Sequence, residues 1–159
     1  MKKKQIILNL IIIFLIFFLD RISKLYILNI AETEGNVDIV VNSFLNIILV
    51  WNSGIAFGLF QVDQALIYNF ITILIIIVNL IIIYLLYRAS NFHKILFSMI
   101  LGGSFGNLYD RIYFAAVPDF IDLNYKGYHW FVFNVADIFI TIGIITLIFF
   151  EILQIKNEK

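Results

Sequence analysis

The sequence predicts an all-α integral membrane protein, a four-transmembrane-helix bundle that also carries a small β-rich segment outside the membrane. Of the 159 residues, 62% are hydrophobic and only 14% are charged, whereas soluble domains usually carry about a quarter charged residues. Four stretches of the chain also reach the length of about 20 mostly apolar residues that a helix needs to cross a bilayer. These observations indicate that lipid surrounds most of the chain.

The four predicted spans divide the chain into membrane segments and short connections. The second span contains no charged residue, and the other three carry charges only near their ends. We expect one membrane-embedded domain over residues 1–159, with spans at about 6–28, 66–87, 95–113 and 134–153 and outer segments at about 29–63 and 114–133.

The N-terminal stretch begins like a secretory signal peptide, with Lys2, Lys3 and Lys4 ahead of an apolar run. A signal peptide ends at a small-residue cleavage site, and no such site follows this run closely. We therefore expect the first stretch to be a retained membrane anchor.

The basic residues predict how the spans are oriented, because cytoplasmic loops of membrane proteins carry an excess of lysine and arginine. The first connection contains four acidic residues and no basic one, and the third contains Lys126 as its only basic residue. Both connections should therefore lie on the extracytoplasmic side. Both termini should lie in the cytoplasm, on the side that holds Lys2, Lys3, Lys4, Arg88, Lys94, Lys156 and Lys159.

The first outer connection contains a segment, residues 37–50, that is rich in β-branched residues and follows a Gly35-Asn36 turn signal. This pattern predicts short strands between the first two helices. The segment is too apolar for a free loop, so we expect it to lie on the membrane surface and on the bundle. As a hypothesis, the whole outer segment at about 29–63 acts as a cradle or lid over the site. Trp51 and Trp130 suit the aromatic belt at the membrane interface.

The polar side chains inside the predicted spans gather near one depth. Asp20 lies about 22 Å along the first helix, and Lys24 is one turn further on the same face. The third and fourth spans place their polar residues near the outer surface as well. Charged groups in hydrocarbon are costly and usually mark a functional site. The residues that share this depth are Asp20, Lys24, Asn107, Asp110, Arg111, Asp119, Asn134 and Asp137.

A structural interpretation competes with a functional one for some of these residues. Asp20 with Lys24, and Asp110 with Arg111, can form ion pairs that hold the helices together. The third span also has small residues four apart, which let two helix backbones approach closely. We expect packing rather than chemistry from these small residues, namely Ser98, Gly102, Gly103 and Gly106.

Asp119 and Asp137 have no cation of their own in this pattern, which favours a catalytic role. Two carboxylates that share one proton can activate water. The ionised carboxylate takes a proton from water as it attacks an amide, and the protonated one donates to the carbonyl oxygen. We therefore predict a catalytic Asp119–Asp137 pair, in which the spacing alone does not assign the base.

Other chemistries fit the sequence less well. Ser23 and Lys24 are adjacent on a helix and point about 100° apart, and no His-Glu-x-x-His motif is present. The chain has no cysteine, and its histidines, His93 and His129, are far apart, so no metal or other cofactor is predicted. Equal numbers of acidic and basic residues give no field for nucleic acid. Two non-protease alternatives are a small proton-coupled transporter or channel that uses intramembrane aspartates and a non-catalytic assembly factor.

Five blocks of this sequence resemble those of the bacterial lipoprotein signal peptidases, also called type II signal peptidases. The blocks occur in the family's order and cover nearly the whole chain, although Arg21 stands where the family commonly has glutamine. The blocks are Asp20-Arg21-Ile22-Ser23-Lys24, Asn52-Ser53-Gly54-Ile55-Ala56-Phe57, Gly102-Gly103-Ser104-Phe105-Gly106-Asn107-Leu108-Tyr109-Asp110-Arg111, Val117-Pro118-Asp119-Phe120 and Phe133-Asn134-Val135-Ala136-Asp137.

The resemblance implies an intramembrane aspartic endopeptidase of the bacterial cytoplasmic (inner) membrane, with its active site toward the extracytoplasmic face. The implied substrates are diacylglyceryl-modified prolipoproteins, which the enzyme would cut before the lipidated cysteine. Asp119 and Asp137 would be the catalytic pair of a monomer whose partners are this substrate and membrane lipid. By the same resemblance, Asn52, Gly54, Asn107, Arg111 and Asn134 would line the substrate site, braced by Asp20, Lys24 and Asp110.

Overall fold

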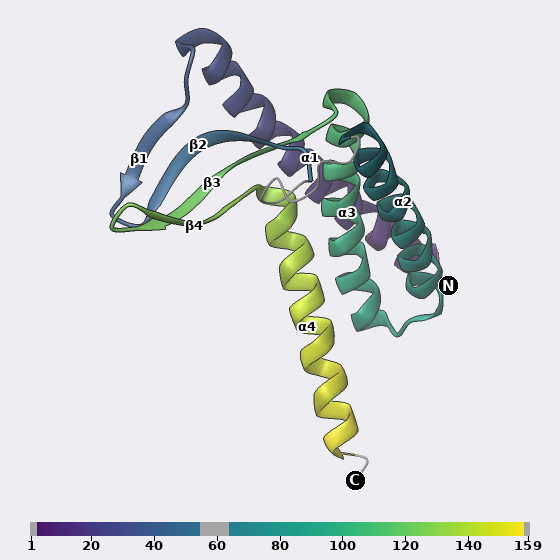
Figure 1. The fold of residues 1–159 in the computed structure, drawn as a ribbon. Coiled ribbons are helices and arrows are strands. Elements are labelled where there is room, and N and C mark those ends of the chain that lie inside the picture. Colours follow the sequence, from purple (N-terminus) through teal and green to yellow (C-terminus); the bar gives the residue numbers. More distant parts are fainter. Residues whose placement is uncertain (1–2, 55–63, 158–159) are drawn as a thin grey trace.

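The computed structural model describes residues 3–54 and 64–157, which form four helices and one four-stranded sheet. Figure 1 shows the sheet at one end of the helices, with both chain termini away from it. The elements are, in chain order, α1 (Lys3–Glu34), β1 (Asp38–Asn42), β2 (Leu45–Asn52), α2 (Gln64–Arg88), α3 (Asn91–Phe114), β3 (Val117–Tyr125), β4 (Tyr128–Phe133) and α4 (Val135–Asn157).

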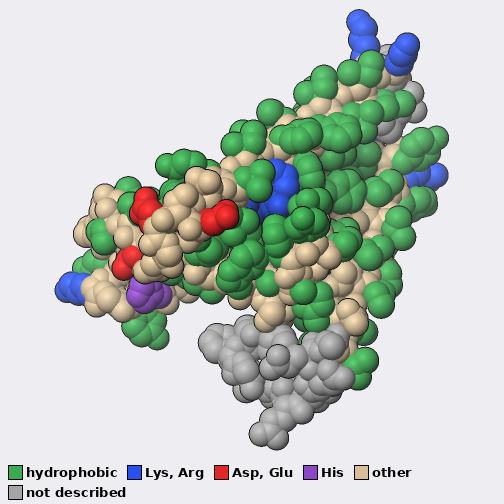
Figure 2. Space-filling model, turned by 90° about the horizontal axis from the view of Figure 1, so that it is seen from above, with side chains coloured by type: hydrophobic (Ala, Val, Ile, Leu, Met, Phe, Trp, Pro, Cys, Tyr) green, Lys and Arg blue, Asp and Glu red, His purple; other side chains and the backbone are tan. Residues whose placement is uncertain are grey.

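Three of these helices are long and apolar enough to cross a membrane, over Lys3–Glu34, Leu66–Arg88 and Val135–Leu153. They agree with three of the four predicted spans, and the span at 95–113 stays a prediction. Large hydrophobic side chains are exposed along these three helices, and Figure 2 shows them covering the outside of the helices. Exposed apolar surface of this extent fits lipid and not water.

The fourth helix, α3, differs because it lies between the others and packs against α1, α2 and α4. A helix that is surrounded by protein does not need an apolar surface on every side. A Cβ at Gly102 would lie 2.9 Å from the Ile13 carbonyl oxygen of α1, and one at Gly103 would lie 2.5 Å from the Ala136 carbonyl oxygen of α4. The predicted close packing of the small residues is therefore confirmed.

The C-terminal end of α1 lies further along the chain than hydropathy predicts. The helix continues to Glu34, beyond the predicted span at 6–28, because hydropathy marks the thickness of the bilayer and not the end of a helix. The chain leaves α1 at Gly35, where φ is +76° and the amide donates to the Ala31 carbonyl oxygen at 3.0 Å. This left-handed residue is a common helix terminator.

The strands predicted after the first helix are present as β1 and β2. The sheet also contains β3 and β4, in the antiparallel order β1-β2-β3-β4, and these two strands were not predicted. A two-residue turn joins them, in which Lys126 has φ 51° and Gly127 has φ 80°. Such a turn matches the twist of an antiparallel pair, and the aromatic run of β4 after it was the signal that sequence reasoning missed.

A small hydrophobic cluster holds the sheet against the end of α1. Its buried members are Ile27, Val37 and Phe120, which come from α1, from the start of the first connection and from β3. The strand that carries Asp119 is therefore fixed against the helices. Partly buried residues extend the cluster, namely Ile30, Ala31, Ile47, Leu49, Ile121 and Val135.

Parts of the first outer connection that entered the predictions lie outside the described residues. They are residues 55–63, which include Ile55, Ala56 and Phe57 of the second sequence block and the acidic Asp63. Lys2 and Lys159 lie outside them as well.

Candidate active site

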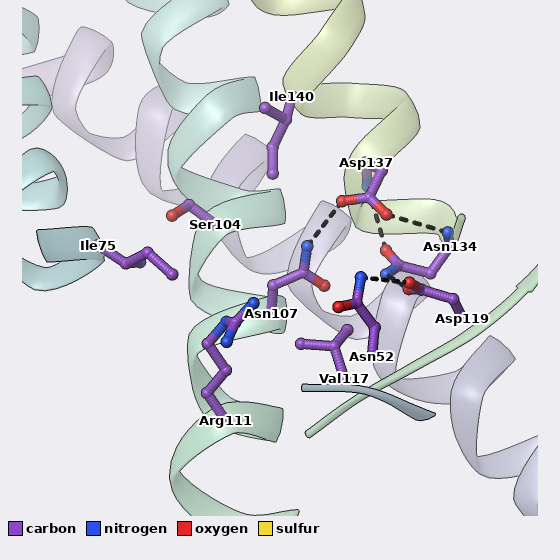
Figure 3. A pocket seen from close by; sticks show the side chains of 10 residues that line it. All are labelled: Asn52, Ile75, Ser104, Asn107, Arg111, Val117, Asp119, Asn134, Asp137 and Ile140. Atoms are coloured by element: carbon purple, nitrogen blue, oxygen red, sulfur yellow. Dashed lines mark hydrogen bonds between the residues drawn. The ribbon is translucent and has the colours of Figure 1, made fainter. Parts of the chain in front are cut away.

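Six of the predicted polar residues line a cavity of about 190 Å³ at the sheet end of the bundle (Figure 3). Side chains from β2, α3, β3 and α4 point into it, so the site needs both outer connections to fold back onto the helices. Asp119 and Asp137 both face this cavity. Its lining consists of Asn52, Ile75, Ser104, Asn107, Arg111, Val117, Asp119, Asn134, Asp137 and Ile140.

Asp119 on β3 is only 3% exposed and accepts two side-chain hydrogen bonds. Asn52 Nδ2 donates to its Oδ2 at 2.9 Å, and Asn134 Nδ2 donates to its Oδ1. Burial raises the pKa of Asp119 above its ordinary value of 3.8, these two hydrogen bonds partly offset that effect, and the charge of Asp137 raises the pKa further. Asp119 is therefore a carboxyl group that holds its proton more strongly than an exposed aspartate.

Asp137 lies at the start of α4, where it forms a reciprocal cap with Asn134. The Asn134 amide donates to Asp137 Oδ2 at 3.1 Å, and the Asp137 amide donates to Asn134 Oδ1 at 3.1 Å. A third group, Asn107 Nδ2, donates to Asp137 Oδ1 at 2.8 Å. This capping box stabilises the helix start, and it also fixes the direction in which the carboxylate faces the cavity.

Asn134 connects the two aspartates. Its side-chain nitrogen donates to Asp119, while its side-chain oxygen accepts from the Asp137 amide. An amide side chain has one donor end and one acceptor end, so its orientation is determined when both ends are bound. One buried side chain thereby sets the relative position of the strand carboxylate and the helix carboxylate.

Lys24 is fully buried beneath this pair and uses all three of its ammonium hydrogens. It donates to Asp20 Oδ2 at 2.8 Å, to Asp110 Oδ2 at 2.7 Å and to Asn107 Oδ1 at 2.8 Å. The last bond orients the Asn107 amide so that its nitrogen points to Asp137. The structure therefore brings together the three residues that were expected to brace the site.

Asp20 has a further contact that the sequence did not indicate. Its Oδ1 accepts a hydrogen bond from the Ala136 amide at 3.0 Å, which is one of the free N–H groups at the start of α4. Its other oxygen faces Gly106, where a side chain would clash with it. Asp20 thus links α1, α3 and α4 at the level of the site.

The predicted pairing of Asp110 with Arg111 is wrong. Asp110 Oδ1 instead forms an ion pair with Arg21 Nη2 at 2.6 Å, and its Oδ2 forms one with Lys24 Nζ at 2.7 Å. Both partners come from α1, whereas Arg111 lines the cavity. The Arg21 guanidinium also lies 4.9 Å from the centre of the Tyr109 ring. Sequence reasoning missed this role of Arg21, although its place beside Asp20 was the available signal.

Arg111 is directed to the cavity and forms no ion pair with any side chain that the structure describes. Its guanidinium lies 5.7 Å from the centre of the Tyr68 ring and directly against Gly54, where a Cβ would lie 2.8 Å from Nη1. Gly54 has φ +81°, and its amide donates to Asn52 Oδ1 at 2.8 Å. The close approach of Arg111 therefore requires glycine at this position.

A larger cavity of about 620 Å³ adjoins the polar one and shares Asn52, Asp119 and Asp137 with it. The aspartates therefore lie where a small polar cavity meets a larger and mostly apolar one. The other walls of the larger cavity are Leu123, Phe131, Val132 and Phe133 from the β3–β4 hairpin and Ile138, Thr141 and Ile142 from α4.

Comparison of the sequence with known proteins identifies the family to which it is similar. The family model described as Signal peptidase (SPase) II matches residues 12–153. A lipoprotein signal peptidase of Pelagibacter ubique is 56% identical over 156 residues, which cover 98% of this chain and 93% of that protein. One from Anaplasma phagocytophilum is 38% identical over 153 residues, which cover 94% of each protein.

Solved structures agree with the sequence comparisons. A structure titled as a bacterial membrane enzyme matches with a TM-score of 0.77 at 29% identity, and the match covers 95% of this chain and 91% of that one. A second structure with the same description matches with a TM-score of 0.74 and covers 89% of this chain and 90% of that one. With matches of this extent in sequence and in fold, the chain belongs to the signal peptidase II family.

Proposed function

We propose that this protein is a membrane-embedded aspartic endopeptidase that removes signal peptides from diacylglyceryl-modified prolipoproteins by cutting before the lipidated cysteine. The observation that carries the proposal is the pair of carboxylates, Asp119 and Asp137, that face one cavity and are joined through Asn134. Membership of the signal peptidase II family supports the processing of lipoproteins.

The two carboxylates would act on one water molecule between them. The ionised carboxylate takes a proton from the water as its oxygen attacks the peptide carbonyl carbon, and the protonated one donates its proton to the carbonyl oxygen. The raised pKa of Asp119 supports a shared proton, because a buried carboxyl group beside a second carboxylate resists ionisation. As the tetrahedral intermediate collapses, the C–N bond breaks, the amine leaves with the proton taken from the water, and one hydroxyl of the intermediate returns its proton to the aspartate that had donated it.

Three residues would contact the peptide, and two asparagines would hold the aspartates. Arg111 has a guanidinium directed into the cavity that can donate to a substrate carbonyl oxygen. Asn52 and Gly54 lie at the end of β2, where they can contact an extended peptide backbone. Asn107 and Asn134 already orient the carboxylates, so they would hold the aspartates in place while the substrate is bound.

The larger cavity suits the lipid part of the proposed substrate. Its walls are mostly apolar, and on α4 they continue into exposed residues such as Ile142 and Ile145. Acyl chains could therefore stay in contact with lipid while the peptide bond reaches Asp119 and Asp137. A cysteine without acyl chains would leave this apolar surface uncovered, which supports preference for the lipidated form.

We place the protein in the bacterial cytoplasmic membrane, with four spans, both termini in the cytoplasm and the aspartates near the extracytoplasmic surface. Basic side chains at the end of the helices opposite the aspartates, among them Lys4, Arg88 and Lys94, support this orientation. Acidic and histidine side chains gather over the sheet end (Figure 2). The whole of residues 1–159 would act as one monomeric peptidase domain.

Incubation of the purified protein with lipidated and unlipidated forms of one prolipoprotein tests this function. We expect cleavage of the lipidated form only. Asp119→Asn and Asp137→Asn should each lower the cleavage rate by about 10²–10⁴-fold, because each removes one proton-transfer group. Full activity in either variant would refute the role of that aspartate. Absence of cleavage together with proton transport by the protein in sealed vesicles would indicate the transporter alternative.

Asp122→Asn is the matched control for these variants. Asp122 lies on the same strand and is fully buried, but it accepts a hydrogen bond from His129 Nδ1 at 2.8 Å and does not line the polar cavity. Its variant should retain most of the cleavage rate. Thermal unfolding of all three variants in detergent separates loss of chemistry from loss of fold.

A further inference from the structure

A small basic cavity lies at the end of the helices away from the proposed catalytic pair. It has a volume of about 200 Å³ and lies between the first turns of α1 and α3. Asn107, which contacts Asp137, is 16 residues further along α3 than Asn91, or about 24 Å at 1.5 Å per residue. The proposed reaction therefore does not use this cavity. Its lining residues are Lys4, Gln5, Asn91 and Lys94.

Lys94 is the unusual member of this lining, because it is largely buried and no side chain in the described part of the chain supplies an opposite charge. Only 8% of it is exposed, and it forms no ion pair with any side chain that the structure describes. Lys24, which is fully buried, instead contacts two carboxylates. A largely buried lysine without a counter-charge among the described residues is unfavourable, so the surroundings of Lys94 suit an anion that is supplied from outside the chain.

The rest of the cavity also suits an anion. Lys4 adds a second positive charge from α1, and none of the described residues that line the cavity is acidic. Asn91 is the first residue of α3, and the Ser90 side chain does not cap this helix start. The first amide groups of α3 therefore keep their partial positive charge, which favours a phosphate or carboxylate ligand.

We propose that this cavity binds the phosphate of an anionic phospholipid headgroup. A lipid is favoured over a free phosphate because the next residues of α1, Ile6 and Ile7, are exposed and apolar, so acyl chains could continue along the helix from the headgroup. Basic pockets between membrane helices on the cytoplasmic side are typical of lipid headgroup sites. The ligand holds Lys94 and Lys4 together and thereby stabilises the contact between α1 and α3.

The experiment measures thermal unfolding of the full chain in detergent micelles that are titrated with phosphatidylglycerol, phosphatidylcholine or inorganic phosphate. Phosphatidylglycerol should raise the unfolding temperature in proportion to its occupancy of the site, and the other two should not. Lys94→Gln and Lys4→Gln should each weaken the apparent affinity for phosphatidylglycerol about fivefold. Lys3→Gln is the matched control, because it removes the same charge from the same helix turn outside the cavity.

The outcomes distinguish binding of the lipid in this cavity from general attraction between a basic protein surface and an anionic lipid. An equal shift with phosphatidylcholine, or an equal loss of affinity in Lys3→Gln, would overturn the proposal. A shift with inorganic phosphate that matches the one with phosphatidylglycerol would show a site for a soluble anion and would also overturn it. Should Lys94→Gln not fold, Lys4→Gln still decides the result, because Lys4 is exposed and its replacement leaves the packing intact.

Discussion

Asn134 shows how a single side chain can hold both a helix start and a candidate active site. As the residue before α4 it caps the helix through Asp137, and at the same time it donates to Asp119 on the sheet. Removal of the Asn134 side-chain amide would break the hydrogen bonds that fix the positions of the two carboxylates relative to each other. We also expect the burial of Asp119 to make the stability of the fold depend on pH.

The stability of the protein should depend on pH through Asp119. Its pKa is raised in the folded protein, whereas the unfolded chain has the ordinary value of about 3.8. As the pH rises from that value to the raised pKa, the unfolded chain has released a proton that the folded protein still holds, so the free energy of unfolding decreases. Asp119→Asn should therefore show a weaker decrease across this interval, measured by unfolding at several pH values.

Asp38→Asn is the control for this pH dependence, because Asp38 is an exposed carboxylate on the same sheet. Its variant should keep the decrease seen in the unmodified protein. The same pH profile for Asp119→Asn and the unmodified protein would contradict a raised pKa at Asp119.

Lys24 carries more of the polar network than any other described side chain at the site. Lys24→Met would leave Asp20 and Asp110 buried, with Arg21 as their one remaining counter-charge among the described side chains. Breaking a buried ion pair on one side costs about 3–5 kcal/mol, and we expect a loss of that order in the free energy of unfolding. Lys4→Met, at an exposed position of the same helix, should cost much less, and an equal loss would contradict the role of the network.

Among the helices, α3 determines how closely the others approach. Its glycines face the backbone of α1 on one side and of α4 on the other. The contact with α4 also places Asp137 next to Asn107. Spacing between these two helices should therefore affect stability and catalysis together.

Gly103→Ala tests this spacing. The added methyl group would meet the Ala136 carbonyl oxygen, which is backbone and cannot turn away, so α4 must shift. We expect a loss of about 1–3 kcal/mol in stability and a lower cleavage rate. Gly143→Ala lies at the same helix contact but meets first the Ile100 side chain at 2.6 Å, so it should cost less. Equal losses of stability and cleavage rate in Gly103→Ala and Gly143→Ala would contradict the proposed control of the site by the spacing between α3 and α4.

The β3–β4 hairpin shows where prediction from the sequence stopped. Its strand β3 pairs with β2, which is about 70 residues earlier in the chain, as in Trp51 with Pro118. Local patterns do not report a partner at that distance, and β3 does not alternate clearly because its first four residues are all buried. The hairpin was therefore expected only as an outer segment, although its turn and aromatic strand were visible.

The molecule as a whole has two chemically different ends, with the aspartates and the sheet at one and the small basic cavity at the other. This asymmetry predicts its orientation in the membrane. The chain has no cysteine, so single cysteines can be labelled without background. Lys126→Cys, at the tip of the β3–β4 hairpin, should react with an impermeant thiol reagent in spheroplasts.

Ser90→Cys is the matching position between α2 and α3, and it should react only after the membrane is opened. The two variants are both exposed in the structure, so a difference in labelling reports the side of the membrane. Labelling of both positions in sealed spheroplasts, or the reverse pattern, would contradict the proposed orientation.

The sequence by itself determined the membrane class, the helical stretches, the first two strands and six of the polar residues that line the cavity. Hydrophobicity, helical spacing and charge are local properties, so they can be recognised along a single chain. The tertiary structure alone decided the partners: Asp110 contacts Arg21 and not Arg111, Asp20 caps α4, and Asn134 joins the two aspartates. These contacts connect residues that are far apart in the chain or point away from their neighbours, and only the packing of helices and sheet brings them within hydrogen-bonding distance.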